Sequence, residues 1–360
     1  MTTAATPVMV AVFNHKGGVA KTTTACNLAV CLAAHGYRVV LVDLDTQGNA
    51  TSSFGVSPLP AIGAYDVISG QADLAQAVLS TTYPNLWLLP ATTSLRAAEA
   101  DRAVAGQNHM LLRAGLERGG INGAADLVVV DCPPALGMLT TNALASANAV
   151  MMPVRPDPFA HEGLVNTWYE VRRIRESRNP GLGVAGILLT MTASELAGGD
   201  VSQTIRAEFG EQVYAVEVAT DPRVAEAAQL GLPVCVLDPD CAAARGYLAA
   251  AEEMLARMAR QNRPGTALPP AGTTDAALNV LREWRASIHG SLLRLPSRHR
   301  DLEGHGPTPL RLPDDEDDEF LPAPPRRWVG MATALLVGLA CGMVLEASGG
   351  ILAGLRKLAE

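Results

Sequence analysis

Near the start of the chain, two lysines flank a pair of glycines in the stretch Asn14-His15-Lys16-Gly17-Gly18-Val19-Ala20-Lys21-Thr22-Thr23-Thr24. An apolar run over 8–13 precedes this stretch, and a helical pattern over 25–34 follows it. A strand that turns through glycines into a helix presents successive backbone N–H groups and a helix N-terminus, which together attract anions. We therefore expect a phosphate-binding loop, with Lys21 at the β- and γ-phosphates and the Thr22 hydroxyl on Mg²⁺.

This loop departs from the common phosphate-binding pattern, G-x-x-x-x-G-K-[ST], at both glycine positions. His15 and Ala20 stand where that pattern has glycine, and Lys16 is a second lysine five residues before Lys21. Because the methyl group of Ala20 disfavours a positive φ, we expect ordinary helical or β backbone angles at that residue. The two lysines around Gly-Gly-Val-Ala favour a ligand site over a plain glycine-rich turn.

Aspartates end two other apolar runs. Asp43 ends one buried-strand pattern, with Asp45 two residues later, and Asp131 ends another. Ligands of parallel sheets bind beyond the carboxyl ends of the strands, where these side chains are expected. We expect Asp131 to hold Mg²⁺ through its hydration shell, on the side opposite Thr22. For Asp43 and Asp45 two interpretations stay open: they face the phosphates, or they cap the next helix.

Three segments resemble, in this order, the nucleotide boxes of the ParA/MinD family of P-loop ATPases, with the closest likeness to ParA-type partition ATPases. They are Lys16-Gly17-Gly18-Val19-Ala20-Lys21-Thr22-Thr23, Asp43-Leu44-Asp45-Thr46-Gln47-Gly48-Asn49 and residues 131–144. The first resembles the deviant Walker A loop of the family. The second resembles a ParA box that normally has Pro at the position of Thr46, and the third resembles the segment that begins at the Walker B aspartate. The likeness covers residues 8–260.

The resemblance implies a Mg·ATP site that is completed in a homodimer. Residues 16–23 then bind the nucleotide, and Thr22, Asp45 and Asp131 surround the metal. In this family the first lysine, here Lys16, reaches across a nucleotide-sandwich dimer to the partner's phosphates, and Asp45 orients the attacking water. Phosphoryl transfer mainly needs a positioned water and compensated charge. The expected catalytic residues are Lys16, Lys21 and Asp45.

The elements that position these residues form an alternating pattern over the first two-thirds of the chain. Apolar runs alternate with helical patterns, which predicts an α/β fold with a mainly parallel twisted sheet flanked by helices. Strands are expected over 8–13, 38–43, 86–90, 125–131, 151–154 and 183–192, and helices over 22–35, 65–68, 74–79 and 241–260. By the resemblance, 214–227 is a loop and helix, and 231–239 is a late strand that lines the base pocket. The P-loop ATPase domain is expected to span 1–260.

Composition and cysteine use narrow the class of protein. The 360 residues carry a net charge of −8, which argues against a strongly basic protein that coats nucleic acid. Part of the excess acid lies in the run 314–319, so DNA binding stays open. The six cysteines lack C-x-x-C spacing and indicate a reducing compartment. Because residues 1–7 contain no apolar signal core, we expect the ATPase domain in the cytoplasm.

Non-specific DNA contact is a further expectation from the resemblance. ParA proteins bind DNA with basic residues on one face of the dimer. Arg223 matches one such position, and Arg206 lies near another basic region. Such contacts neutralise phosphates and read no sequence. The arginines of 172–178 offer another patch, or a helix face that is simply solvated. A DNA-binding adaptor of ParB type is the partner that the resemblance adds, with nucleoid association as the location.

The chain beyond residue 260 departs from the family pattern. We expect 261–325 to be a Pro/Gly-rich linker that contains an amphipathic helix and an acidic disordered run. In the helix, apolar residues recur at steps of three and four residues from Leu278 to Leu292. We expect this helix to dock on the ATPase domain.

A hydrophobic segment, 326–360, ends the sequence. Its uncharged part, 328–345, covers roughly 26 Å as a helix, close to the lower limit for spanning a bilayer. Arg326 and Arg327 precede it, as the positive-inside tendency expects for a cytoplasmic flank. We expect membrane contact here, with anchoring to the inner membrane as one outcome. A spanning helix, an in-plane helix and a buried hairpin all stay open.

These observations predict an ATP-driven dimerising switch that partitions a plasmid or chromosome, or positions another cargo. The alternative is a membrane-anchored ParA/MinD-like spatial organiser that does not bind DNA. Two other classes are disfavoured. The nitrogenase iron protein needs cysteines for a shared cluster, and of the six cysteines only Cys132 is expected near the site. Bacterial tyrosine kinases have a Tyr-rich tail, and residues 264–360 contain no tyrosine.

Overall fold

The computed structural model describes residues 5–95, 109–192, 199–261 and 268–292. The acidic run 314–319 and the hydrophobic segment 326–360 lie outside these ranges, so the predictions for them remain predictions. Within the described ranges, no helix combines the length and the apolar character that a membrane crossing requires.

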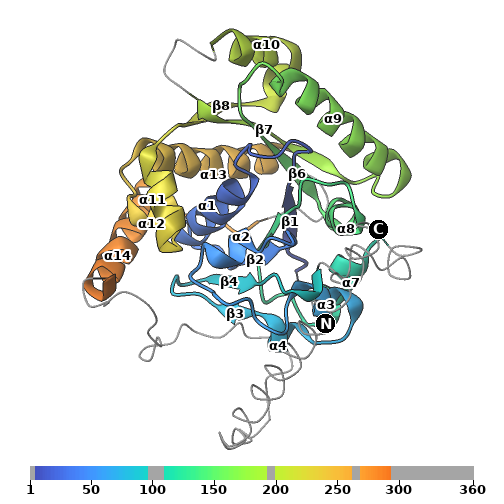
Figure 1. Ribbon diagram of the computed structural model, residues 1–360, viewed down its shortest axis with the longest axis vertical. Helices are drawn as coiled ribbons and strands as arrows, with labels where there is room; N and C mark the ends of the chain where they lie inside the picture. The colour runs from blue at the N-terminus through green and yellow to red at the C-terminus, as the bar shows by residue number, and fades with distance from the viewer. Residues whose placement is uncertain (1–4, 96–108, 193–198, 262–267, 293–360) are drawn as a thin grey trace, which may run out of the picture. The chain divides into compact units, whose positions relative to one another are not determined.

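An eight-stranded sheet forms the centre of the fold, in the order β3-β4-β2-β5-β1-β6-β7-β8 (Figure 1). The strands are β1 Val8–Val12, β2 Val39–Asp43, β3 Leu79–Ser80, β4 Leu86–Leu89, β5 Leu127–Asp131, β6 Ala149–Val154, β7 Gly183–Thr192 and β8 Val213–Ala219. Every pair is parallel except β3 with β4. Valine-rich runs suit the central strands because both faces of these strands are buried. The predicted α/β fold is confirmed.

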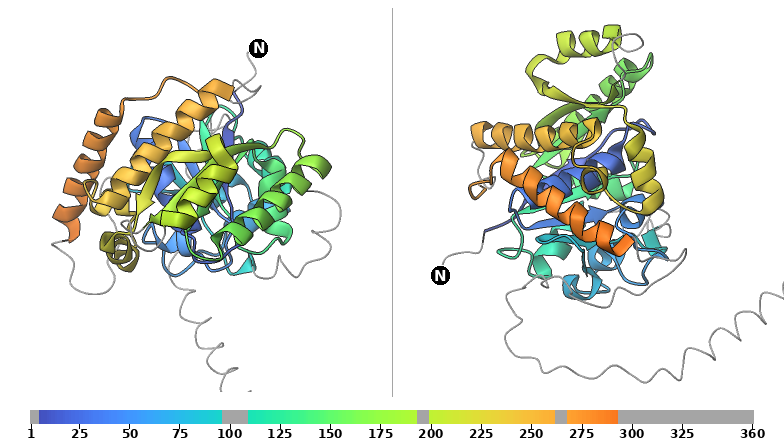
Figure 2. Two further views of the ribbon diagram at one scale, coloured as in Figure 1. Left: turned by 90° about the horizontal axis from the view of Figure 1, so that it is seen from above. Right: turned by 90° about the vertical axis from the view of Figure 1, so that its left-hand side faces the viewer.

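Helices cover both faces of this sheet (Figures 1 and 2). They are α1 Lys21–Ala34, α2 Asn49–Ser52, α3 Ala64–Ser69, α4 Leu74–Ala77, α7 Leu111–Arg118, α8 Met138–Ser146, α9 Ala160–Ser177, α10 Gly199–Phe209, α11 Pro222–Leu230, α12 Val234–Leu237, α13 Ala242–Gln261 and α14 Thr274–Leu292. Side chains alternate along β1, so that Val10 packs with α1 and α13 on one face. Ala11 packs with α8 and α9 on the other face.

The neighbours of β1 bring the chemical residues together. β5 and β6 flank β1, and β2 lies next to β5 on its other side. Because these strands are parallel, their carboxyl ends meet at one edge of the sheet. The loop 13–20 follows β1 at this edge, and Asp43 and Asp131 end β2 and β5 in register with each other.

The predicted late strand over 231–239 is wrong. Residues Val234–Leu237 form the short helix α12, which Pro233 precedes as N-cap. A four-residue apolar run does not distinguish a buried strand from a buried helical turn. The edge strand is instead β8, in the first half of the segment 214–227 that was expected to be a loop and helix. Its second half forms α11, as predicted.

The amphipathic helix α14 docks on the ATPase domain, as expected. Ala277 and Leu281 are buried against the α1 side of the core, and the Trp284 ring lies 5.4 Å from that of Tyr83. The Arg282 guanidinium pairs with Asp240 at 2.6 Å. Within the pattern that was predicted from Leu278 onward, Leu278, Leu281, Trp284 and Ile288 pack on the core, and the helix belongs to the same compact unit as the ATPase domain.

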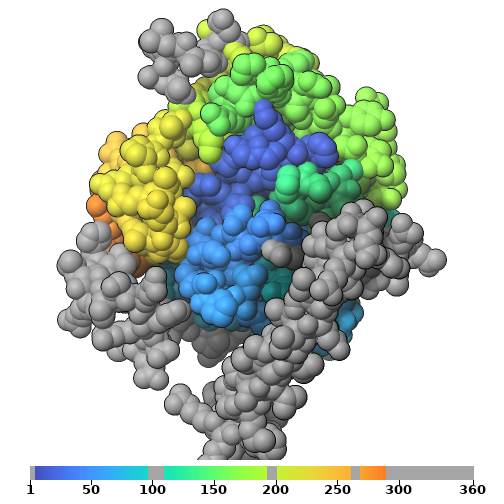
Figure 3. Space-filling model, viewed as in Figure 1, coloured from blue at the N-terminus to red at the C-terminus, as the bar shows by residue number. Residues whose placement is uncertain are grey.

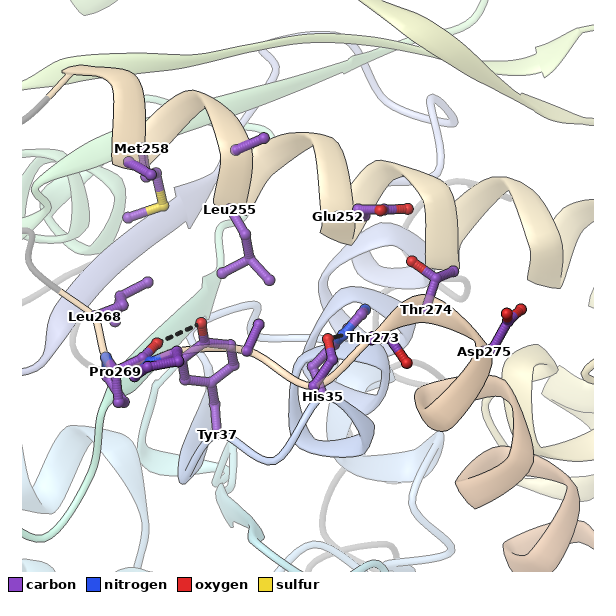
Figure 4. Close-up of a pocket in the computed structure, with 15 residues that line it drawn as sticks. His35, Tyr37, Glu252, Leu255, Met258, Leu268, Pro269, Thr273, Thr274 and Asp275 are labelled. Carbon is purple, nitrogen blue, oxygen red and sulfur yellow. Dashed lines mark hydrogen bonds between the residues drawn. The ribbon is translucent and has the colours of Figure 1, made fainter.

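The segment before α14 also contacts the domain. The Tyr37 hydroxyl donates to the Pro269 carbonyl at 2.9 Å, and the Gly272 N–H donates to the His35 carbonyl at 3.0 Å. This segment and α13 form the walls of an open groove, lined by Leu255 and Met258 among others (Figure 4). Residues 268–273 are therefore attached to the domain by hydrogen bonds, although most of them are exposed and their composition is that of a linker.

Candidate functional site

The loop after β1 lies at the surface of the sheet edge. In Figure 3 it is the dark blue segment, between the green α9, the yellow α11 and α12, and the lighter blue segment that follows β2. Gly18 has φ +71°, and Ala20 has φ +62° and ψ +33°. Ala20 is therefore in the left-handed region, and the prediction of ordinary backbone angles there is wrong. A left-handed L-residue costs about 1–2 kcal/mol, which the surrounding structure must offset.

Hydrogen bonds hold the loop in this conformation. The Thr190 hydroxyl of β7 donates to the Val19 carbonyl at 3.1 Å. The Asn14 side chain accepts from the Lys16 N–H at 2.9 Å, and the Ala20 carbonyl accepts the Thr24 N–H at 2.8 Å. These contacts define the backbone on both sides of Ala20. The first turn of α1 and the Thr190 side chain thus hold the backbone at Ala20, and this explains why its methyl group is tolerated in the left-handed region.

Lys21 begins α1 and lies under the loop. Its ammonium donates to the Lys16 carbonyl at 2.9 Å, and its side chain is largely buried. Burial lowers the pKa of Lys21, while the nearby Asp131 and Asp45 carboxylates oppose this shift. The structure therefore brings Lys21 together with both predicted metal-site aspartates.

Asp43 is fully buried and has a structural role. One of its carboxylate oxygens accepts the N–H and the hydroxyl of Thr51 at 2.8 and 2.7 Å, and the other accepts the Asp45 N–H at 3.1 Å. Burial raises the pKa of Asp43 to about 6. Of the two interpretations for this aspartate, the contacts support capping of the turn and of α2.

Asp45 differs from Asp43 because it extends past the end of β2. One of its oxygens accepts the Gln47 N–H at 2.9 Å, which stabilises the turn that carries it. Its charge also acts on both Lys21 and Asp131. The turn therefore leaves Asp45 on the loop side of the sheet edge.

Asp131 is buried, and neither of its carboxylate oxygens has a well-formed hydrogen bond within the described residues. Burial raises its pKa well above the usual range, and Asp43 adds to this. The neighbouring Thr22 hydroxyl and Lys21 ammonium lower it only in part. A buried carboxylate without partners is costly unless a cation satisfies it. Thr22, Asp45 and Asp131 offer the oxygen donors that Mg²⁺ prefers, so these residues fit the predicted ion.

Protein side chains alone do not enclose a metal at this edge. Among the described residues, no group of three or more His, Cys, Asp or Glu side chains is arranged to hold one. This agrees with Mg²⁺ chemistry, because that ion usually takes one or two protein oxygens and completes its shell with water and nucleotide phosphates.

Lys16 is held by its own chain. Its ammonium donates to both carboxylate oxygens of Asp157, at 2.5 and 2.6 Å. The sequence analysis did not single out Asp157, because its role depends on a contact with a residue far away in the sequence. Thr190 and Thr167, which hold the loop backbone, were also missed because their roles depend on tertiary contacts. The expected contact of Lys16 with a second protomer remains a prediction.

The two arginines proposed for DNA contact are paired within the chain. Arg206 donates to the Tyr214 carbonyl at 2.7 Å and to Glu217 at 2.6 Å. Arg223 pairs with Glu226 at 2.6 Å and with Asp238 at 3.4 Å. Both lie outside the nucleotide site.

Two of the arginines of 172–178, on α9, are paired within the chain in a similar way. Arg172 pairs with Glu176 at 2.7 Å, and Arg173 pairs with Glu170 at 2.8 Å. These pairs are consistent with a solvated helix face, which was one of the two interpretations of the arginine cluster.

Comparison with known proteins reveals strong similarities. A family model described as an AAA domain matches residues 8–184. The chromosome partitioning protein ParA of Caulobacter vibrioides is 38% identical over 251 residues, which cover 69% of this chain and 94% of that protein. The sporulation initiation inhibitor protein Soj of Bacillus subtilis is 37% identical over 250 residues, covering 69% of this chain and 98% of Soj.

A solved structure gives the ligand context. Cobyrinic acid a,c-diamide synthase from Mycobacterium smegmatis, with bound ADP and magnesium, superposes with a TM-score of 0.59. It is 31% identical, and the match covers 72% of this chain and 97% of that one. A protein of this fold and of similar sequence therefore carries a nucleotide and Mg²⁺.

Proposed function

The chain belongs to the ParA/MinD family of P-loop ATPases, and from this membership we propose that it is an ATP-dependent dimerising switch for DNA partition or cargo positioning. One observation carries the proposal: a strained lysine loop lies at the same edge of the sheet as buried Asp131, whose carboxylate has no well-formed hydrogen bond to the residues that the structure describes. The first feature suits phosphates and the second suits a cation. Together they suit the anionic phosphates and the Mg²⁺ cation of Mg·ATP.

The residues at this edge have distinct roles in the proposed reaction. The N–H groups of 16–23 and the Lys21 ammonium bind the phosphates and compensate their charge. Thr22 and Asp131 hold the Mg²⁺ site, and bound Mg²⁺ supplies further compensation of phosphate charge. Asp45 orients the attacking water, because it stands beyond the end of β2 on a turn that its own side chain stabilises. Hydrolysis then needs no covalent nucleophile.

Dimerisation is the step that turns this site into a switch. In the proposed dimer, Lys16 of each protomer contacts the phosphates bound by its partner. ATP therefore favours the dimer, and hydrolysis removes the contact that distinguishes the two states. A surface that binds only the dimer is consequently held with ATP and released after hydrolysis.

DNA is the proposed surface, with Arg223 and Arg206 as phosphate contacts and an adaptor of ParB type as the activating partner. The names of the Caulobacter ParA and of related chromosome-partitioning proteins support this choice. The cytoplasm, with nucleoid association, is then the proposed location. The cis ion pairs of both arginines must exchange for DNA phosphates, so each arginine should contribute only weakly and appreciable binding should need the contacts of both protomers of a dimer.

Filter binding of full-length protein to duplex DNA, at two salt concentrations with and without Mg·ATP, tests this function. We expect ATP-dependent retention that falls steeply as salt rises. Arg223→Ala should weaken retention at every DNA sequence, with Arg173→Ala as a matched control on another exposed helix. ATP hydrolysis without any ATP-dependent DNA retention would contradict the DNA role and favour the membrane-anchored alternative, which fractionation with and without residues 326–360 then tests.

A further inference from the structure

Lys16 is folded back against the start of α9. Its ammonium contacts both oxygens of Asp157 and lies 6.0 Å from the centre of the Phe159 ring. Its aliphatic stem passes over Gly163, where an added Cβ would lie 3.5 Å from Lys16 Cδ and 3.6 Å from Lys16 Cβ. The Lys16 side chain is therefore held on its own protomer by the ion pair with Asp157, by the Phe159 ring and by contact with Gly163, which has no side chain.

Asp157 is fixed independently of the lysine. Its side chain accepts the Phe159 N–H at 3.0 Å, and its own carbonyl accepts the Ala160 N–H at 2.8 Å at the start of α9. Burial raises the pKa of this carboxyl, but the Lys16 ammonium and the Phe159 N–H outweigh that effect and lower it. The carboxylate is consequently charged and already in place for Lys16.

The backbone of the loop is attached to α9 by other groups. The Thr167 hydroxyl accepts the His15 N–H at 3.1 Å and lies 3.0 Å from the Asn14 side-chain oxygen. Thr167 is fully buried. Since these contacts do not involve the Lys16 side chain, that side chain can leave Asp157 while the loop stays in place.

We propose that Asp157 is a positioning residue that holds Lys16 in cis until the triphosphate bound to a second copy of this chain takes its place. The inference rests on the proposed function. It adds Asp157 as the group that competes with the partner's triphosphate for Lys16. Phe159, which is 71% exposed, lies beside Lys16, so this end of the ion pair is at the solvent-facing surface of the protomer.

The Lys16–Asp157 ion pair should affect dimerisation measurably and still exchange for another anion. The Lys16 and Asp157 side chains are 28% and 26% exposed, so water screens the pair in part. Ion pairs of this kind change an equilibrium by roughly two- to fivefold. A symmetric dimer releases two lysines, so the expected effect on its dissociation constant is roughly 4- to 25-fold.

Sedimentation equilibrium of the full chain with Mg²⁺ and a non-hydrolysable ATP analogue measures this constant. Asp157→Asn and Asp157→Ser keep an acceptor for the Phe159 N–H but remove the charge, and both should bind the analogue normally as monomers. We expect both to lower the dimer dissociation constant roughly 4- to 25-fold. Glu176→Gln, which removes a paired carboxylate at the far end of α9, should leave it within twofold.

A double-mutant cycle assigns the effect to Lys16. Because Lys16→Ala alone should stay monomeric, the double variant Lys16→Ala/Asp157→Asn should also stay monomeric with bound analogue, and a double variant that dimerises would show that Asp157 acts by a route other than Lys16. An unchanged or weaker dimer in both Asp157 variants, beside a wild type that does dimerise, would overturn this inference alone. A wild type that stays monomeric with bound analogue would overturn the proposed function, and the inference with it.

Discussion

At the scale of single residues, the site combines an unfavourable backbone conformation with buried charged side chains that the protein itself satisfies only in part. Ala20 has a left-handed backbone, and Asp131 is buried without a well-formed hydrogen bond in the described part of the chain. Lys21 is buried and donates to a carbonyl of its own loop. Such features are typical of sites that gain stability from a ligand. Mg·ATP offers phosphate oxygens to Lys21 and a cation to Asp131.

Thr190→Val tests whether the strained loop depends on β7. The variant keeps the side-chain shape but leaves the Val19 carbonyl without its donor. Because a hydrogen bond of this kind contributes about 1 kcal/mol, we expect binding of a fluorescent ATP analogue to weaken about three- to tenfold. Thr192→Val, on the same strand, removes a bond to Val218 outside the loop and should change affinity less than twofold. Equal effects would argue against the role of Thr190.

Asp43 predicts a pH dependence of stability in the absence of Mg²⁺ and nucleotide. Its pKa is about 6 in the folded chain against 3.8 for a free carboxyl, so the folded state binds more protons between these values. This contribution to stability is full below about pH 4 and is lost as pH rises through about 6. Between pH 5 and 7.5 it amounts to about 1 kcal/mol.

Urea unfolding at these two pH values measures that contribution. Other carboxylates titrate as well: the lowered pKa values of Asp157 and Asp240 oppose this contribution and the raised pKa of Asp131 adds to it, so the comparison must be with a variant. We expect wild type to lose about 1 kcal/mol more than Asp43→Asn over this range. Identical pH profiles for the two proteins would show that Asp43 is not the titrating group.

At the scale of elements, α1 links the site to the part of the chain beyond residue 260. The helix begins at Lys21, and its buried face contacts α13, α12 and the added helix α14. Arg282 and Arg285 of α14 also pair with Asp240 and Asp238 in the segment after α12. The amphipathic helix is therefore part of the support of α1.

Leu281→Ala tests the contribution of α14 to the fold. The Leu281 side chain is buried, so its truncation should lower the free energy of unfolding by about 2–4 kcal/mol. Asn279→Ala, on the exposed face of the same helix, should change it by less than about 0.5 kcal/mol. Urea unfolding with the two variants side by side measures the difference. A small loss for both would mean that α14 does not stabilise the domain.

Sequence patterns predicted most of these elements because their periods are long and regular. The central strands and the helices α1, α13 and α14 lie within a residue or a few of the expected ranges. The run 234–237 was misjudged because four apolar residues carry no period. The backbone of Ala20 was misjudged because tertiary hydrogen bonds overrode its intrinsic preference. The Lys16–Asp157 pair joins residues far apart in sequence, which no local pattern indicates.

At the scale of the whole molecule, we propose that the nucleotide site lies within one protomer and that Lys16 of its loop acts at the site of the next. Family membership and the geometry around Lys21, Thr22 and Asp131 support a nucleotide site within one protomer. The position of Lys16 beside the exposed Phe159 ring is the structural basis for its proposed contact with the second protomer. Partition or positioning follows only if ATP controls assembly.

Sedimentation of the full chain with and without Mg·ATP analogue tests that claim most directly, with Lys16→Ala and Lys21→Ala as companions. We predict that wild type is a monomer alone and a dimer with the analogue. Lys16→Ala should bind the analogue yet stay monomeric, whereas Lys21→Ala should lose most nucleotide binding. A Lys16→Ala variant that dimerises as wild type does, or a wild type that binds the analogue and stays monomeric, would contradict the account.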